Sequence, residues 1–272
     1  MKKIVLLLAL LILSGCRQKT EVVVSKPEPT LIPTVTIIPT QKPITIDDLN
    51  KKYGPCTKVS VLMYHHIQDE ATAKVNNQVS LTVTPEFFRK HLQYLKDKGY
   101  SVIGMTDLNN FFNKAVALPK KSAIITLDDA YEDNYTNAYP ILKEFGYKAT
   151  IFVPTGHVMG LEYLTWDRMR QMSDLVYFAN HTWSHHASTG SAQVLEKEIS
   201  LADKQLAEHG FNSDKVFAYP YGNPSGEAEK ILAKYNYTLA FTTTHGNIMC
   251  KSQKYILSRI RIGNAPLSSY GL

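Results

Sequence analysis

Cysteine and tryptophan are scarce in this sequence, and no stretch of it is strongly basic. The 272 residues contain three cysteines, which excludes a disulfide-rich scaffold, so each cysteine has to be interpreted separately. The net charge of +6 is spread along the chain, which is not typical of a nucleic-acid-binding protein. A hydrophobic content of 44% excludes a multi-span membrane protein and suffices for one domain of roughly 200 residues. We therefore expect one globular domain without a nucleic-acid partner.

The N-terminus has the pattern of a secretory signal. Two lysines precede an unbroken apolar run over residues 4–13, which is too short to span a bilayer comfortably. The run ends in residues 13–16 (LSGC), which resemble the lipobox of bacterial lipoproteins, where the cysteine is lipidated and becomes the mature N-terminus. We therefore expect removal of residues 1–15 and export of the protein. Lipidated Cys16 would then anchor it at the outer face of the bacterial cytoplasmic membrane.

The next segment is predicted to be an extended tether. Residues 17–42 contain no glycine and show no helical period, and prolines interrupt any regular structure. In polyproline II geometry, about 30 residues would reach on the order of 90 Å. Such a reach suits an enzyme that acts on a polymer above the membrane, and it equally suits a spacer without functional consequence. We assign residues 16–55 to the lipidated cysteine and tether, and residues 56–272 to the folded catalytic domain.

Strand-like and helical patterns alternate in the folded part. Strands are expected at residues 59–63, 123–127, 149–153, 176–179, 216–218, 238–241 and 260–262. Helices are expected at about residues 133–145, 167–172, 191–208 and 225–235, and one more starts at Thr84, a hydroxyl N-cap followed by proline. This alternation predicts an α/β fold with a mainly parallel sheet or barrel.

Polar residues follow four of these strands directly. They are His65 and His66, Asp128 and Asp129, His181 and His185, and the run Tyr219–Gly222. In (β/α) barrels, the active site assembles at the C-terminal ends of the strands. We therefore expect the four groups to meet in one site.

The residue types in these groups point to a metal-dependent hydrolase. His181 and His185 are four residues apart, so that one helical turn would bring both imidazoles to one ion. Such a pair alone is more often structural, but Asp128 and Asp129 are costly to bury without a cation or a proton. One carboxylate and two histidines leave coordination positions open, as a catalytic metal requires. The second carboxylate would then serve as a general base on water.

Three motifs in the same order resemble those of the NodB-type polysaccharide deacetylases, carbohydrate esterase family four. They are residues 126–135 (TLDDAYEDNY), 180–185 (NHTWSH) and 217–222 (FAYPYG). Residues 64–67 (YHHI) and 257–261 (LSRIR) resemble the poly-N-acetylglucosamine deacetylase branch. The resemblance covers about residues 59–262, and it implies the distorted (β/α) barrel of this family.

The resemblance also implies roles for individual residues. Asp128 resembles the general base of the family, and three residues resemble its metal ligands: Asp129, His181 and His185. Tyr221, which follows Pro220, resembles the tyrosine whose backbone N–H stabilises the oxyanion. The implied ion is zinc, with cobalt or nickel as alternatives. The implied enzyme is a monomer that removes N-acetyl groups from an N-acetylglucosamine polysaccharide, either an exopolysaccharide or a cell-wall glycan.

Two positions depart from the family pattern. The usual glycine after the two aspartates is Ala130, whose Cβ crowds a tight turn. The usual arginine of the third motif, which orients the base, is replaced by Ala218. We expect Arg259 or Arg261, near the end of a neighbouring strand, to take the place of that arginine.

The general acid has two candidates. The late family motif that supplies a histidine is not recognisable, and in the poly-N-acetylglucosamine branch the histidine comes from the first strand. His65 fits that position, and His245 is the competing candidate. His66 would point to the other side of the strand from His65, so we expect the two residues to differ in function.

Other functions stay open at the level of sequence. An O-acetyl esterase acting on a polysaccharide such as xylan would need the same residues. A degenerate glycan-binding lipoprotein without activity is disfavoured because the base and ligand positions are intact. An iron oxygenase would use the same ligand set, but such sites usually lie in a double-stranded β-helix. A purely structural lipoprotein leaves the convergence of the polar groups unexplained.

The two remaining cysteines are candidates for a disulfide. Export favours oxidation, and after lipidation of Cys16 only Cys56 and Cys250 remain. Cys56 precedes the first strand, whereas Cys250 is expected in a loop just beyond a strand end. These positions leave open whether the two residues lie at the same end of a barrel.

Overall fold

A computed structural model describes residues 44–272 of the chain. The predicted signal segment, the lipidation site at Cys16 and most of the predicted tether lie outside the described residues. Within the described part, the chain forms one compact unit over Ile44–Leu272. No helix among these residues has both the length and the apolar character needed to cross a membrane.

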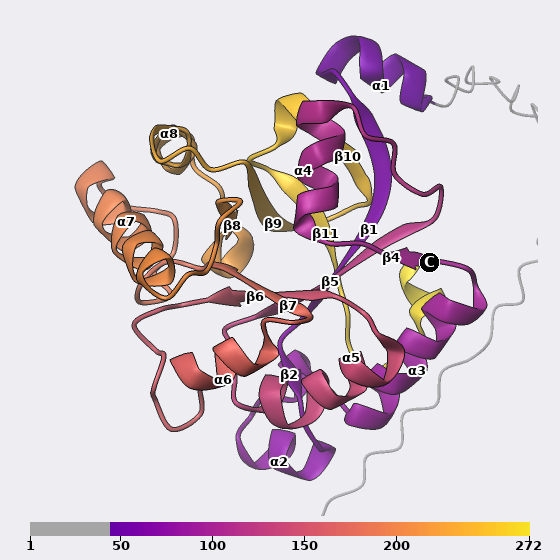
Figure 1. Ribbon diagram of the computed structural model, residues 1–272, viewed down its shortest axis with the longest axis vertical. Helices are drawn as coiled ribbons and strands as arrows, with labels where there is room; N and C mark the ends of the chain where they lie inside the picture. The colour runs from indigo at the N-terminus through magenta and orange to yellow at the C-terminus, as the bar shows by residue number, and fades with distance from the viewer. Residues whose placement is uncertain (1–43) are drawn as a thin grey trace, which may run out of the picture. The chain divides into compact units, whose positions relative to one another are not determined.

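Parallel strands form a closed barrel (Figure 1). They are β1 (Cys56–Tyr64), β5 (Ser122–Asp128), β6 (Ala149–Val153), β7 (Val176–Asn180), β8 (Val216–Ala218), β9 (Leu239–His245) and β11 (Leu257–Arg261). Their order is β1-β11-β9-β8-β7-β6-β5, and the pairing of β1 with β5 closes the ring. The predicted (β/α) barrel is therefore confirmed.

Four short strands complete the sheets. β4 (Ser101–Val102) pairs in parallel with β5, and β10 (Ile248–Cys250) pairs antiparallel with β1. β2 (His66–Ile67) and β3 (Thr82–Val83) form a separate two-stranded sheet. With two or three residues each, these strands are too short to show a hydrophobic period, so that the sequence did not predict them.

Helices connect the strands and cover the barrel. They are α1 (Ile46–Tyr53), α2 (Glu70–Val75), α3 (Pro85–Asp97), α4 (Met105–Lys114), α5 (Tyr139–Phe145), α6 (Trp166–Met172), α7 (Ala192–Glu208) and α8 (Gly226–Lys234). A π-helical turn, η2 (Asn134–Ala138), leads into α5. Short 3-10 turns are η1 (Val79–Leu81), η3 (Pro220–Gly222), η4 (Lys251–Gln253) and η5 (Leu267–Tyr270).

Helix α3 shows how local sequence determines an element. The Thr84 side chain accepts a hydrogen bond from the Phe87 N–H, and Pro85 occupies the first turn, where its missing N–H costs nothing. The buried face consists of Phe88, His91, Leu92 and Leu95, as the helical period predicts.

Helix α1 corrects the predicted domain boundary. It occupies residues assigned to the tether, and its capping box pairs Thr45 with Asp48. None of its residues is buried. The folded part therefore begins near Ile44 rather than at Cys56.

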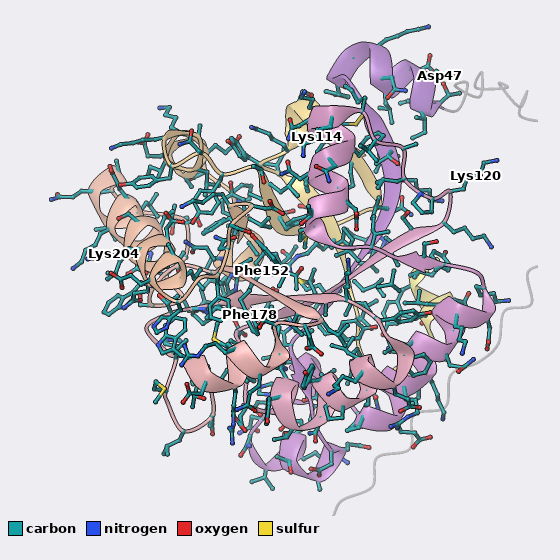
Figure 2. All side chains as sticks on the ribbon, in the orientation of Figure 1. Asp47, Lys114, Lys120, Phe152, Phe178 and Lys204 are labelled. Carbon is teal, nitrogen blue, oxygen red and sulfur yellow. A yellow bond between two sulfur atoms is a disulfide. The ribbon has the colours of Figure 1, made fainter. Side chains whose placement is uncertain are left out.

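The core has an inner and an outer layer. Phe152 lies in the inner layer and Phe178 in the outer layer, and both residues are labelled in Figure 2. Phe152 on β6 packs among residues of the inner cluster, such as Ile124 and Phe241, and this cluster extends to the apolar face of α4. Phe178 on β7 belongs to the outer cluster, between the strands and helices α3, α5 and α6. A third cluster packs α7 and α8 against β8 and β9.

A disulfide joins Cys56 and Cys250. Cys56 is the first residue of β1, and Cys250 ends the antiparallel strand β10, where the two residues stand in register. Cys250 was expected in a loop, but β10 runs back along β1 and brings it to the same end of the barrel. The predicted disulfide is therefore confirmed.

Candidate active site

Asp128 and Asp129 lie at the C-terminal end of β5, where the chain turns sharply. Asp128 is the last residue of the strand, and Asp129 and Ala130 follow with φ of 75° and 57°. Left-handed backbone costs a residue with a Cβ roughly 1–2 kcal/mol. The Ala130 side chain is nevertheless accommodated in the core, at 1% exposure. The alanine at the usual glycine position therefore leaves the turn intact.

Arg259 holds the Asp128 carboxylate from β11. Its Nη1 and Nη2 donate to the two Asp128 oxygens, each over 2.7 Å, and its Nε donates to the Thr242 carbonyl over 3.0 Å. Both partners are buried. Burial raises the pKa of Asp128, but the Arg259 guanidinium, with smaller contributions from His181 and His65, outweighs this effect and holds the pKa below its usual value. Of the two predicted arginines, Arg259 occupies the position beside the base, whereas Arg261 is exposed.

Asp129, His181 and His185 form a cluster with the composition of a metal site. Their ligand atoms all lie within 4.8 Å of one another. Asp129 Oδ1 is 3.5 Å from His181 Nε2 and 3.1 Å from His185 Nε2. Within residues 44–272, this buried oxygen has no hydrogen-bond partner. An unpartnered carboxylate oxygen facing two imidazole nitrogens fits a divalent cation.

Hydrogen bonding fixes the orientation of His181. Its Nδ1 donates to the carbonyl of Ala218 on β8 over 2.8 Å, so that Nε2 presents its lone pair towards Asp129. Burial raises the pKa of Asp129, but the nearby imidazoles of His181 and His185 outweigh this effect and hold the pKa well below its usual value. The carboxylate is therefore available as a ligand.

The two histidines belong to a loop after β7 and not to a helical turn, which corrects the sequence prediction. Thr182 and His185 have left-handed φ of 66° and 57°. The buried Glu198 of α7 holds this loop, because its Oε2 accepts hydrogen bonds from the N–H groups of Trp183 and Ser184 over 3.1 and 2.8 Å. Its Oε1 accepts a third bond from the Ser184 hydroxyl.

The three other histidines considered in the sequence analysis, His65, His66 and His245, lie in different environments. His65 lines a cavity that Asp128 and Asp129 also line, and burial lowers the pKa of His65, an effect that the two carboxylates oppose. His66 turns away, and its Nδ1 is 2.5 Å from an Asp133 oxygen. His245 is exposed at the end of β9 and is not among the residues that line the cavity.

The cavity has a volume of about 520 Å³ and opens at the C-terminal ends of the barrel strands. Its lining combines the predicted residues with several others: His65, Leu81, Asp128, Asp129, Tyr131, His181, His185, Tyr219, Tyr221, Thr243 and Arg261. The structure thus brings together the predicted base, the predicted metal ligands and the favoured general acid.

Tyr221 is 64% exposed, and its ring packs edge-on against His185, with the centroids 4.8 Å apart. Its φ of 60° belongs to the tight turn η3, which starts at the buried Pro220. Gly222 follows at φ 76°, where a Cβ would come within 1.9 Å of Thr243 Oγ1. Only glycine fits this position, so it fixes the place of Tyr221 at the cavity.

Three tyrosines contribute aromatic rings to the cavity, and other aromatic side chains lie elsewhere. Tyr131, Tyr219 and Tyr221 line the cavity, whereas Trp166 stacks on His209 and Tyr135 stacks on Tyr139.

The sequence analysis did not identify Glu198 as a residue that supports the site. Its position one residue before Ile199, on the buried face of α7, is the signal that could have identified it, since a carboxylate on an apolar face needs partners.

Comparisons with known proteins agree with this geometry. The sequence model of a family described as polysaccharide deacetylase matches residues 115–240. The protein YxkH of Bacillus subtilis (strain 168) is 29% identical over 207 residues, which cover 75% of this chain and 71% of that protein. The poly-beta-1,6-N-acetyl-D-glucosamine N-deacetylase of Staphylococcus aureus (strain MRSA252) is 26% identical over 199 residues, covering 67% and 68%. The structure of the Streptococcus pyogenes deacetylase PplD in complex with acetate superposes with a TM-score of 0.73 at 30% identity, covering 79% of this chain and 99% of that one.

Proposed function

This chain belongs to the polysaccharide deacetylase family, and from that premise we propose that it removes N-acetyl groups from a polysaccharide containing N-acetylglucosamine. The family consists of hydrolases, so the chain is an enzyme that acts on carbon–nitrogen bonds. The similarity to the poly-beta-1,6-N-acetyl-D-glucosamine N-deacetylase of Staphylococcus aureus supports a poly-N-acetylglucosamine substrate. An exopolysaccharide and a cell-wall glycan both contain this unit.

One observation carries the proposal: Asp128, held by Arg259, lies in one cavity with the cluster of Asp129, His181 and His185. We assign the three clustered residues to a divalent ion, with zinc as the first choice because two imidazoles and one carboxylate suit it. When bound, such an ion polarises a carbonyl and lowers the pKa of a water molecule.

Proton transfer and stabilisation of the negative charge are assigned to other residues of the cavity and to Arg259. Asp128 accepts the proton of the attacking water, and Arg259 keeps its carboxylate ionised and correctly oriented. His65 donates a proton to the leaving amine, which is a poor leaving group unless it is protonated. The backbone N–H of Tyr221 stabilises negative charge on the acetyl oxygen.

We further propose that the enzyme works as a monomer at the cell surface. The signal pattern of residues 1–15 and the lipobox-like sequence at Cys16 support export and lipid anchoring. Substitution of Cys16 by alanine should release the protein or leave it unprocessed. Unchanged, detergent-dependent membrane association of that variant would contradict the lipid anchor.

The test of the function is acetate release from a panel of polymers by zinc-loaded full-length protein. The panel contains poly-N-acetylglucosamine, cell-wall glycan and acetylated xylan. We expect acetate from the first or the second, and loss of two to four orders of magnitude in rate for Asp128→Asn, with metal retained. Acetate from xylan alone would make the enzyme an O-acetyl esterase. No acetate from any polymer would favour a glycan-binding protein without activity.

A further inference from the structure

A second cavity lies directly beside the catalytic one. It has a volume of about 320 Å³ and is lined by β2, α2 and the loops that follow β5 and precede α6. Figure 1 shows β2, α2 and α6 along the lower edge of the barrel. Volumes of this order accommodate small ligands.

Three chain segments contribute to both cavities. His65 lines the catalytic cavity and its neighbour His66 the second; Tyr131 lines the first, and Glu132 and Asp133 the second. Residues 78–81 provide the third segment, with Gln78 in the second cavity and Leu81 in the first. The rings of Tyr131 from the first lining and His66 from the second stack with their centroids 3.6 Å apart, so that the two cavities adjoin at this pair. A polymer seated in the first cavity therefore passes close to the second.

The lining of the second cavity is acidic. It contains no lysine or arginine, but it contains four carboxylates, those of Asp69, Glu132, Asp133 and Glu162. Glu132 forms an ion pair with Arg168, and Asp133 pairs with His66. Asp69 and Glu162 form no ion pair with any described residue, so the cavity carries uncompensated negative charge.

His66 supplies a second and independent indication of a ligand. The residue is 4% exposed, and its ring stacks on Tyr131 with the centroids 3.6 Å apart. Its Nδ1 donates to Asp133, while its Nε2 is buried and has no hydrogen-bond partner among residues 44–272. A buried polar nitrogen without a partner costs free energy, unless a bound molecule provides the missing hydrogen bond.

We propose that this cavity is a subsite for a protonated 2-amino sugar, that is, a unit of the polymer that has already lost its acetyl group. Asp69 and Glu162 pair with its ammonium group, and a sugar hydroxyl donates to Nε2 of His66. The inference rests on the proposed function, because only a deacetylase generates such a cationic unit next to its own catalytic cavity. Its consequence is a preference for chains that are already partly deacetylated.

The test measures binding of a glucosamine tetramer and of an N-acetylglucosamine tetramer by calorimetry, in the presence of a chelator. The variant Asp69→Asn/Glu162→Gln removes two charges at exposed positions, and asparagine preserves the hydrogen bond that Asp69 makes to the Thr72 N–H. The matched control, Asp97→Asn/Glu208→Gln, removes two exposed charges that do not line the cavity. We expect the variant to bind the glucosamine tetramer about tenfold more weakly, and the control to bind it like wild type.

Two results would overturn the subsite: equal binding of the glucosamine tetramer by wild type and the charge-removing variant, or no preference of wild type for it over the acetylated tetramer. Acetate release by the zinc-loaded wild type is measured separately. If acetate is released without the binding difference, the subsite fails and the deacetylase function stands. If the binding difference occurs without acetate release from any substrate, the catalytic proposal fails instead.

Discussion

Both carboxylate oxygens of Asp128 accept a hydrogen bond from Arg259, each over 2.7 Å, although the two residues are 131 positions apart in the chain. Arg259 is completely buried and uses its Nε for the Thr242 carbonyl. β11 therefore supplies the orienting arginine that the third motif lacks at Ala218. Since the carboxylate is buried as well, its charge depends on this partner.

Substituting Arg259 by lysine should impair turnover more than binding. Lysine keeps one positive charge but cannot form the two parallel bonds to Asp128. We expect kcat to fall by roughly ten- to a hundredfold with KM within about threefold of wild type, since the base is misoriented while the substrate contacts persist. Steady-state kinetics on the preferred polymer checks this. Arg261→Lys serves as the comparison, and an equal loss of kcat there would contradict the special role of Arg259.

Removing one histidine of the cluster should abolish metal binding. His181→Ala deletes an imidazole whose orientation is fixed by the Ala218 carbonyl, and reloaded protein should then hold less than about a tenth of an equivalent of zinc. The matched control is His186→Ala, because His186 neighbours His185 in the chain but is not part of the cluster. Elemental analysis after dialysis provides the measurement. Wild-type zinc content in His181→Ala would show that the site is wrongly assigned.

Glu198 should act on metal affinity through the loop that it holds. Glu198→Leu leaves the N–H groups of Trp183 and Ser184 without their acceptor, and we expect zinc affinity to fall by about ten- to a hundredfold. Glu198→Gln retains an acceptor oxygen and should stay within a few-fold of wild type. Glu196→Leu, on the same helix, controls for the loss of a carboxylate. Competition with a zinc chelator measures the zinc affinity of the three variants. A similar zinc affinity in Glu198→Leu and Glu198→Gln would refute the positioning role of Glu198.

The disulfide should stabilise the fold without contributing to catalysis. Cys56 and Cys250 are separated by 194 residues, and closing a long loop restricts the unfolded chain. For Cys56→Ser/Cys250→Ser we expect a loss of about 2–4 kcal/mol in the free energy of unfolding, with kcat at 25 °C unchanged. Urea denaturation of the wild type and the variant gives the difference. Two free thiols in denatured, unreduced wild type would contradict the bond itself.

The sequence alone predicted which residues meet in the site, because each follows a parallel strand and the ends of such strands share one face of the barrel. It did not predict their local geometry. The spacing of His181 and His185 indicates a helical turn, yet the loop uses left-handed residues and the support of Glu198. That support comes from α7, a contact between distant segments that leaves no local pattern.

The sequence also left open which of Arg259 and Arg261 lies beside the base. Two residues apart on a strand, they share a face, so that alternation cannot choose between them. The two arginines differ in depth, because Arg259 lies inside the barrel and Arg261 near its mouth, and this depth determines which one contacts Asp128.

Helix α1 was not predicted for another reason. Its capping box at Thr45 and Asp48 was readable, but the helix has only 8 residues and directly follows the proline-rich segment, so its short pattern did not separate it from the predicted tether.

His65 provides the last prediction, which concerns the identity of the general acid. The residue lines the catalytic cavity, and His66 lines the neighbouring one. An amide releases an amine that has to be protonated, whereas an activated aryl acetate releases a phenolate unaided.

His65→Ala should therefore slow hydrolysis of the N-acetylated sugar by roughly two to four orders of magnitude and hydrolysis of the aryl acetate much less. His66→Ala should be milder on both substrates, because His66 does not line the catalytic cavity. Comparing the two rates for each variant makes the test independent of losses in folding, which would lower both rates together. An equal decrease for both substrates in folded His65→Ala would make His65 a ligand or a structural residue. The exposed His245, at the end of β9, would then be the next residue to substitute.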